Sequence, residues 1–350
     1  GSTEWAEEHY DELRAHAVAY INSDSNGRGY FNVAGSHTLE KFSNDVARDI
    51  SDPETKISIW KRDRLREIAD ARTAEQREEI RKRADLRIPA LGSGSDYTAF
   101  LQHDGVASLN FGFGGEDGGG IYHSIYDDFY WFTNFSDKDF VYGRALAQAG
   151  STAVMRLADA DLLPFEFGDF ADTVAMYLKE LKALAQKSQD DIRERNREIE
   201  EGVFQATNDP RRPLTPPSVE AVPPHLDFAP LENAVEALNR SAAEYHKAAE
   251  QVNAKGGAPA AFAEVNKLLI ESERKLTNRE GLPNRPWFKH QLYAPGFYTG
   301  YAVKTVPAVR EAIELKQWKQ ADEAIVVVAR VLEDEAALIS SAARKLADAQ

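Results

Sequence analysis

The hydrophobic pattern of this 350-residue chain changes near Asp137, and that change constrains the fold more than any other feature. Before Asp137, short apolar runs alternate with segments of helical periodicity. After it, strand signals fade and long apolar stripes recur at helical spacing. Because a single core seldom grows beyond roughly 250–300 residues, we expect two domains, divided as residues 1–165 and 166–350.

The first half has the strand and helix alternation of an α/β sheet covered by helices. Helices are predicted over residues 3–15, 38–50, 96–103 and 140–162, and strands over 17–23, 86–88 and 106–113. In parallel sheets, ligands bind beyond the carboxyl ends of the strands. Asp24, the segment 92–96 and the loop before His123 would lie at that edge, where the three could converge.

The second half is predicted to be all helical. Three apolar stripes indicate core-facing helices: Phe170, Val174, Tyr177, Leu178 and Leu181; Leu231, Val235, Leu238, Ala242 and Tyr245; and Ile325, Val328, Leu332 and Ile339. Between the first two stripes, residues 208–230 contain seven prolines. This composition predicts an extended surface connection.

Composition excludes several functions. The net charge of −15 opposes binding to phosphate backbones, so nucleic acid is not an expected partner. Acidic residues interleave the basic stretch 61–83, which indicates a solvated helix face. The chain has no cysteine, so disulfides, thiolate zinc sites and cysteine nucleophiles are excluded. It also lacks HExxH, GxSxG and Walker motifs.

Two residues are candidates for metal ligation, each with an ordinary structural alternative. Asp24 follows an apolar strand, where a carboxylate is either a loop cap or a ligand for a cation. His123 lies between aromatic residues and carboxylates, and neutral imidazole is a common zinc ligand, although a lone histidine is more often structural. The other histidines, at 9, 16, 37, 103, 225, 246 and 290, are predicted to be surface or core residues.

Five ordered motifs resemble one family. They are GSTEWAEE, AYINSDS, GSGSDYTAFLQHDGVAS, YHSIYDDFYWF and GLPNRPWFKHQLYAP, and they are similar to the glutamate carboxypeptidase II (prostate-specific membrane antigen) family. The transferrin receptor is a non-catalytic relative of that family. The resemblance implies the C-terminal part of a di-zinc peptidase domain, with a mixed sheet covered by helices, followed by an all-α transferrin receptor-like dimerisation domain.

The resemblance also implies roles for particular residues. Asp24 would bind one zinc ion and His123 the other, and Tyr122 would be a catalytic hydrogen-bond donor to the tetrahedral intermediate. Substrate-binding positions would be Ser25, Gly94, Ser95 and Tyr301. Glu4 and Glu7 match carboxylates that hold a structural calcium ion, and the alternative is that they complement the helix dipole.

Departures from the family pattern carry their own implications. In the family, GSTEWAEE follows a Glu-Glu pair that supplies the general base and a zinc ligand, with a histidine and a bridging aspartate further upstream. This chain starts after them, so we expect it to be inactive alone and to need an N-terminal half, in cis or in trans. The family's arginine patch falls near Asn110 and Gly112, and its pocket lysine at Gly300, so glutamate preference is not implied.

We therefore expect the parent protein to be a zinc metallopeptidase, a carboxypeptidase or dipeptidase with two zinc ions, one structural calcium ion and a peptide substrate. The expected assembly is a homodimer through the helical domain, and the resemblance implies an extracytoplasmic location, membrane-anchored or secreted. The alternative is a non-catalytic, receptor-like or structural dimeric relative. Retention of Asp24, Tyr122 and His123 favours the enzyme.

Overall fold

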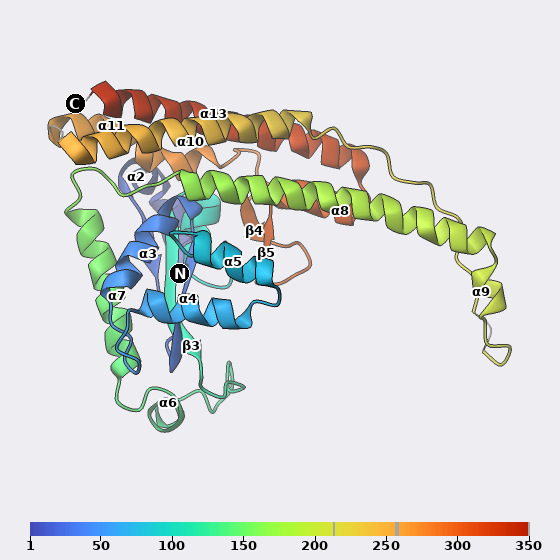
Figure 1. Cartoon of the computed structure of the whole chain (residues 1–350), viewed down its shortest axis with the longest axis horizontal. Coiled ribbons are helices and arrows are strands. Elements are labelled where there is room, and N and C mark those ends of the chain that lie inside the picture. Colours follow the sequence, from blue (N-terminus) through green and yellow to red (C-terminus); the bar gives the residue numbers. More distant parts are fainter. Residues whose placement is uncertain (213, 256–258, 349–350) are drawn as a thin grey trace.

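The computed structural model describes residues 1–212, 214–255 and 259–348, in which a small sheet with its helices lies beneath a layer of long helices (Figure 1). The first part contains α1 (Ser2–Glu8), α2 (Tyr10–His16), β1 (Tyr20–Asn22), β2 (Gly29–Gly35), η1 (His37–Leu39), α3 (Glu40–Asp49), α4 (Ile59–Asp70), α5 (Ala74–Lys82), η2 (Ala99–Asp104), β3 (Ser108–Gly115), α6 (Phe129–Phe135) and α7 (Val141–Ala158). The second contains α8 (Gly168–Glu200), α9 (Val203–Ala206), α10 (Ala229–Lys255), α11 (Pro259–Lys275), β4 (Tyr293–Pro295), β5 (Val303–Thr305), α12 (Pro307–Glu314) and α13 (Trp318–Asp348).

The sheet of the first part is mixed, with the strand order β1-β3-β2. β1 runs parallel to β3, with Tyr20 opposite Ser108, as the strand and helix alternation predicted. β2 runs antiparallel to β3 and was not predicted from the sequence. Its local signal is weak, because glycine stands at both ends and only its first half alternates between buried and partly buried positions.

The strand predicted over residues 86–88 is wrong, because side chains of α3 bind the backbone groups that a strand would use. The amide of Leu86 donates to Asn44 Oδ1 at 2.8 Å, and that of Ile88 donates to Glu40 Oε2 at 2.9 Å. The segment therefore runs beside α3 without joining the sheet.

The predicted helices are confirmed, although the first is interrupted at His9 and the third adopts π geometry from Ala99.

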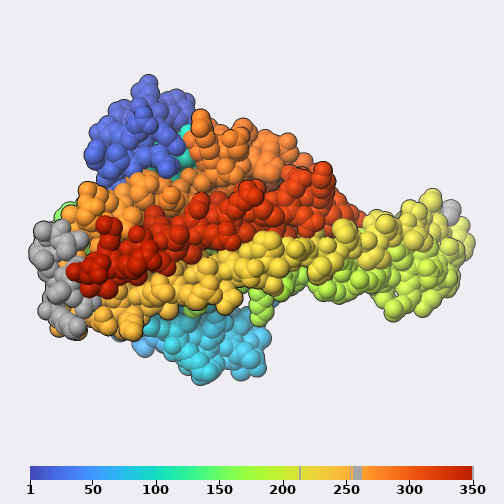
Figure 2. Space-filling model, turned by 90° about the horizontal axis from the view of Figure 1, so that it is seen from above, coloured from blue at the N-terminus to red at the C-terminus, as the bar shows by residue number. Residues whose placement is uncertain are grey.

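Long helices form most of the second part, as predicted, but β4 and β5 pair as an antiparallel two-stranded sheet, so the prediction that this part is all helical is wrong there. Figure 2 shows α10 and α13 lying side by side along the top of the molecule, while the end of α8 projects beyond them as an arm. The stripes on these helices are buried except for Leu178, which is partly buried. The described residues of the 208–230 connection have no regular structure before α10 begins. Residue 213 lies outside the described residues.

A buried polar cluster joins the sheet part to the helical part. His37 Nε2, just after β2, lies 2.7 Å from the hydroxyl of Tyr177 on α8. His290 Nε2 lies 3.0 Å from Oε1 of Glu273 on α11. The ring of Tyr293 stacks on His290 and meets His37 edge-on. His37 and His290 were predicted to be surface or core residues, and the structure shows that both are core residues.

Burial determines the charge state of this cluster. It lowers the pKa of His37 to about 3, with the positive charge of Arg87 adding to the effect. His37 is therefore neutral near pH 7 and contributes hydrogen bonds, not charge. A buried polar group without a partner loses its hydration with no compensation. Breaking the His37–Tyr177 hydrogen bond would therefore lower the free energy of unfolding.

We expect Tyr177→Phe to lower the free energy of unfolding by about 1–3 kcal/mol, because the buried ring nitrogen of His37 loses its partner. Urea denaturation measures this change. Tyr245→Phe is the matched control, since Tyr245 is equally buried against Phe167 but its hydroxyl bonds no described residue. Equal losses in the two variants would show that the His37–Tyr177 bond contributes nothing specific.

Candidate functional site

A hydrogen-bonded group surrounds Asp24 beyond the carboxyl end of β1. The Ser95 hydroxyl donates to Asp24 Oδ1. Asn22 Nδ2 donates to Ser95 Oγ at 3.1 Å and to Asn110 Oδ1 at 2.9 Å. The exposed carboxylate of Asp24 is thus oriented by a side chain from the 92–96 loop. Two of the three segments predicted to converge at this edge do so.

Tyr301, from the second part of the chain, covers the same loop. Its carbonyl accepts the amide of Ser93 at 3.0 Å. Gly94 has a φ of +102°, and a Cβ there would lie 2.8 Å from the Tyr301 ring. A Cβ on Gly92 would meet the Tyr301 carbonyl oxygen even more closely. Tyr301 can therefore reach the loop only because both positions are glycine. Its side chain remains largely exposed.

The third segment makes no hydrogen bond or ion pair with this group among the described residues. Tyr122 and His123 are exposed, with their rings stacked at 3.8 Å, and His123 has a positive φ of 57°. No hydrogen bond or ion pair joins His123 to Asp24. Among the described residues, no three histidine or carboxylate groups gather to hold a metal ion. The metal-binding roles of Asp24 and His123 therefore stay predictions, as does the role of Tyr122 as a catalytic hydrogen-bond donor.

The two glutamates matched to a calcium site have separate partners. Glu4 pairs with the amino group of Gly1, whereas Glu7 Oε1 accepts the indole N–H of Trp287 at 2.6 Å. The Glu7 bond fastens α1 to the segment before β4. No third carboxylate joins them in the described part of the chain, and calcium binding stays a prediction.

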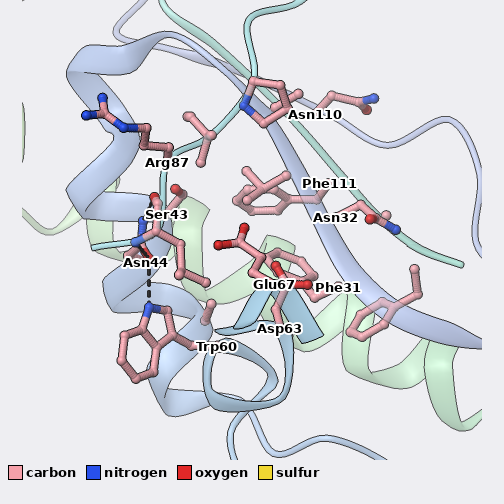
Figure 3. Close-up of a pocket in the computed structure, with 18 of the residues that line it drawn as sticks. Phe31, Asn32, Ser43, Asn44, Trp60, Asp63, Glu67, Arg87, Asn110 and Phe111 are labelled. Carbon is pink, nitrogen blue, oxygen red and sulfur yellow. Dashed lines mark hydrogen bonds between the residues drawn. The ribbon is translucent and has the colours of Figure 1, made fainter. Parts of the chain in front are cut away.

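A cavity of about 400 Å³ lies next to Asp24, between the sheet and helices α3 and α4 (Figure 3). Ser25, Asn110 and Gly112 line the side of the cavity that adjoins the Asp24 group. Phe31, Phe111 and Trp60 give the rest an aromatic surface, and Trp60 Nε1 donates to Asn44 Oδ1 at 2.8 Å. The cavity is large enough for a small side chain or ligand group.

Two carboxylates of α4 point into this cavity. Figure 3 shows Asp63 and Glu67, one helical turn apart, lying side by side. Burial raises the pKa of Asp63 to about 6. It raises the pKa of Glu67 to about 7, with the charge of Asp63 adding to the shift. Arg66, paired with Asp63 at 3.1 Å, offsets this only in part.

The sequence did not reveal these carboxylates. They fall in the stretch 61–83, predicted to be a solvated helix face. That prediction holds for α5, which buries no residue, but it is wrong for the part of α4 that faces the sheet. There Arg62 is buried and pairs with Asp52 at 2.8 Å. The one local signal was the four-residue spacing of Asp63 and Glu67, which places them on a common face.

Gly94→Ala should destabilise the protein by about 1–3 kcal/mol, because it places a Cβ against the Tyr301 ring at a φ that side chains rarely adopt. Urea denaturation gives the stability, and faster proteolysis around residues 296–302 reports displacement of Tyr301. Gly150→Ala is the control: it lies within α7 with no atom within 4 Å of the new Cβ. An equally small change in stability in both variants would contradict the close approach of Tyr301 to Gly94.

Glu67→Gln should stabilise the protein increasingly as pH rises. The folded-state pKa of Glu67, about 7, exceeds the ordinary value of 4.5, so the native state binds its proton more tightly than the unfolded state. Wild-type stability is therefore lost as pH rises from 4.5 through 7. We expect similar stabilities near pH 4.5 and a gain of about 1–2 kcal/mol at pH 8. Asp70→Asn, exposed at the end of the same helix, should show no such pH-dependent gain in urea titrations.

Comparison with known proteins gives the relationships of the chain. Residues 226–340 match the transferrin receptor-like dimerisation domain. "Probable glutamate carboxypeptidase LAMP1" of Arabidopsis thaliana is 31% identical over 316 residues, covering 90% of this chain and 38% of that protein. "Probable glutamate carboxypeptidase" of Arthroderma benhamiae is 28% identical, covering 97% of this chain and 41% of that protein.

A further relative is "Aminopeptidase NAALADL1" of Rattus norvegicus, which is 22% identical and covers 97% of this chain and 42% of that protein. The chain spans about two fifths of the length of these curated relatives. The similarity runs along nearly the whole chain, and the domain match falls on α10, α11 and α13. The chain is therefore similar along nearly its whole length to proteins named as glutamate carboxypeptidases, and its residues 226–340 match a transferrin receptor-like dimerisation domain.

Proposed function

We propose that this chain forms the C-terminal part of a zinc-dependent exopeptidase that hydrolyses peptide bonds with metal-activated water. The observation that carries the proposal is the group formed by Asp24, Ser95, Gly94 and Tyr301, in which both parts of the chain meet at one strand end. Relatives named as carboxypeptidases and an aminopeptidase align with 90–97% of the chain. Their names supply the reaction class.

Each residue has a chemical role in this proposal. Asp24 would offer a carboxylate oriented by the Ser95 hydroxyl, and His123 would offer a ring nitrogen. Tyr122 would donate a hydrogen bond to developing oxyanion charge. Tyr301, Ser25 and the backbone at Gly94 would contact the peptide. Bound zinc would supply a polarised carbonyl and a more acidic water.

The described residues alone do not fit a complete di-zinc cage, because Asp24 and His123 stand without a third ligand group. Two surfaces support completion by further polypeptide. β1 pairs with β3 alone in the described part of the chain, which leaves its other edge open. Near His123, the side chains of Ile125, Tyr126 and Phe129 are more than two-thirds exposed. Exposed edges and aromatic patches of this kind are usually covered.

We further propose that the helical part forms a homodimer, which is what the description of its matched domain indicates. A structural calcium ion at Glu4 and Glu7 and an extracytoplasmic location also belong to the proposal, on the strength of the motif resemblance. No helix in the described residues is long and apolar enough to cross a bilayer.

A peptidase assay with paired chains tests the function. The 350-residue chain alone should show no hydrolysis of dipeptides or blocked peptides and should bind zinc weakly. The same chain extended by the sequence encoded before Gly1, or mixed with a separately encoded N-terminal half, should hydrolyse them and retain two zinc ions through dialysis. Tight binding of two zinc ions by the chain alone would contradict the proposal.

Variants of the active form make the test residue-specific. Asp24→Asn and His123→Ala should each lower activity and zinc content by at least about tenfold, as expected for loss of a metal ligand. Asp127→Asn, in the same exposed segment as His123, should change neither. A zinc-free, inactive but stable dimer in sedimentation would instead support the receptor-like alternative.

A further inference from the structure

A second cavity, of about 520 Å³, lies where α2 meets the end of α11. Its lining residues are Tyr10, Arg14, Glu271, Arg274, Lys275, Thr277, Arg279, Lys289 and Asp334. None of them belongs to the group around Asp24 or to the cavity of Figure 3. In Figure 2 the N-terminal helices, in blue, lie against the orange segment that includes the end of α11. The cavity lies along this contact between the two segments.

The lining is strongly cationic in a chain whose net charge is −15. Five of the nine lining residues are lysine or arginine, against two carboxylates, Glu271 and Asp334. Within the described residues, the only ion pair that these five cations form is Arg274 with Glu271, at 3.9 Å. Lys275 and Arg279 are exposed and form no ion pair there. Few of the cations that line the cavity are therefore held in ion pairs with the protein's own carboxylates.

Specific contacts hold the cations close together. Lys289 Nζ lies 4.5 Å from the centre of the Tyr10 ring, and the Arg14 guanidinium lies 5.5 Å from the same centre. Arg14 Nη1 also donates to the carbonyl of Asp104 at 2.9 Å. Two positive charges thus lie against one aromatic ring.

Arg274 forms the buried base of the cavity. Its Nη2 donates to the carbonyls of Leu13 and Ala17 at 2.9 and 2.8 Å, which closes the end of α2. Its Nε is buried and makes no hydrogen bond within the described residues, and the nearest carboxylate oxygen, Glu271 Oε1, lies 3.9 Å away. A buried charged donor without a hydrogen bond, at the base of a cationic cavity, is a position that an acceptor oxygen of a ligand would satisfy.

Two further titratable groups, Asp104 and His103, lie close to these cations. Asp104 is buried close to Arg14, Lys289 and Arg274, and neither of its carboxylate oxygens is hydrogen-bonded within the described residues. Burial raises the pKa of Asp104 to about 7, so it is only partly ionised near neutrality. His103, which lies 3.1 Å from Lys289 Nζ, has its pKa lowered by burial and adds no negative charge.

We propose that this cavity binds a small, multiply charged oxyanion, namely free phosphate or a compound bearing phosphate groups. Such an anion presents several acceptor oxygens to cations that converge from α2, α11 and Lys289, and charge-assisted hydrogen bonds of this kind are the strong ones. A bound anion would bridge the N-terminal helices to the helical part. It would thereby stabilise the folded chain by mass action.

The test is calorimetric titration of the 350-residue chain with inorganic phosphate and with pyrophosphate, in a phosphate-free buffer of constant ionic strength. Thermal unfolding in the same solutions provides a second measurement. We expect saturable binding of one anion per chain, with pyrophosphate tighter than phosphate, and a rise in unfolding temperature that equimolar chloride does not reproduce. The absence of saturable binding of either anion would overturn the proposal.

The double variant Lys275→Gln/Arg279→Gln should weaken binding by at least about tenfold, while its far-ultraviolet circular dichroism stays unchanged, because both side chains are exposed. The control is Arg240→Gln/Lys319→Gln, which removes the same charge from exposed positions outside the cavity. Equal weakening in both double variants would mean that only the overall charge attracts the anion, and the cavity would not be a site.

Discussion

The structure depends most on the buried contact between the turn after β2 and the helical part. His37 meets Tyr177, and His290 meets Glu273, in an interior where all four side chains are shielded from solvent. Because hydrogen bonds are directional, these contacts set the relative position of the two parts more narrowly than apolar packing could. A continuous apolar core surrounds the cluster and supplies most of the stabilisation.

This contact extends to the candidate site through short steps. His290 Nδ1 accepts the amides of Leu292 and Tyr293, each at 3.2 Å, which positions the start of β4. The carbonyl of buried Gln102 accepts the amides of Lys289 and His290, and the Gln102 side-chain amide donates to the carbonyls of Leu91 and Gly92. The 92–96 loop and the β4–β5 hairpin, which carries Tyr301, are thereby held to one another.

The helical part is therefore a structural component of the site as well as a module matched to a dimerisation domain. Tyr301 reaches Gly94 only because the hairpin is anchored beside the loop, and Ser95 orients Asp24 from that same loop. The cationic cavity lies on another part of the same seam, where Arg274 closes α2. A ligand or substitution at the seam would act on the arrangement of both parts, since packed interfaces transmit strain.

The sequence by itself determined the elements whose signal is local. Apolar stripes at helical spacing predicted the long helices, apolar runs predicted β1 and β3, and the order of five motifs pointed to the family. Only the tertiary structure decided β2, the irregular course of residues 86–88, the burial of Asp63 and the meeting of Tyr301 with Gly94. Each of these rests on contacts between residues distant in the chain or on competition for backbone hydrogen bonds, and periodicity carries no information about either.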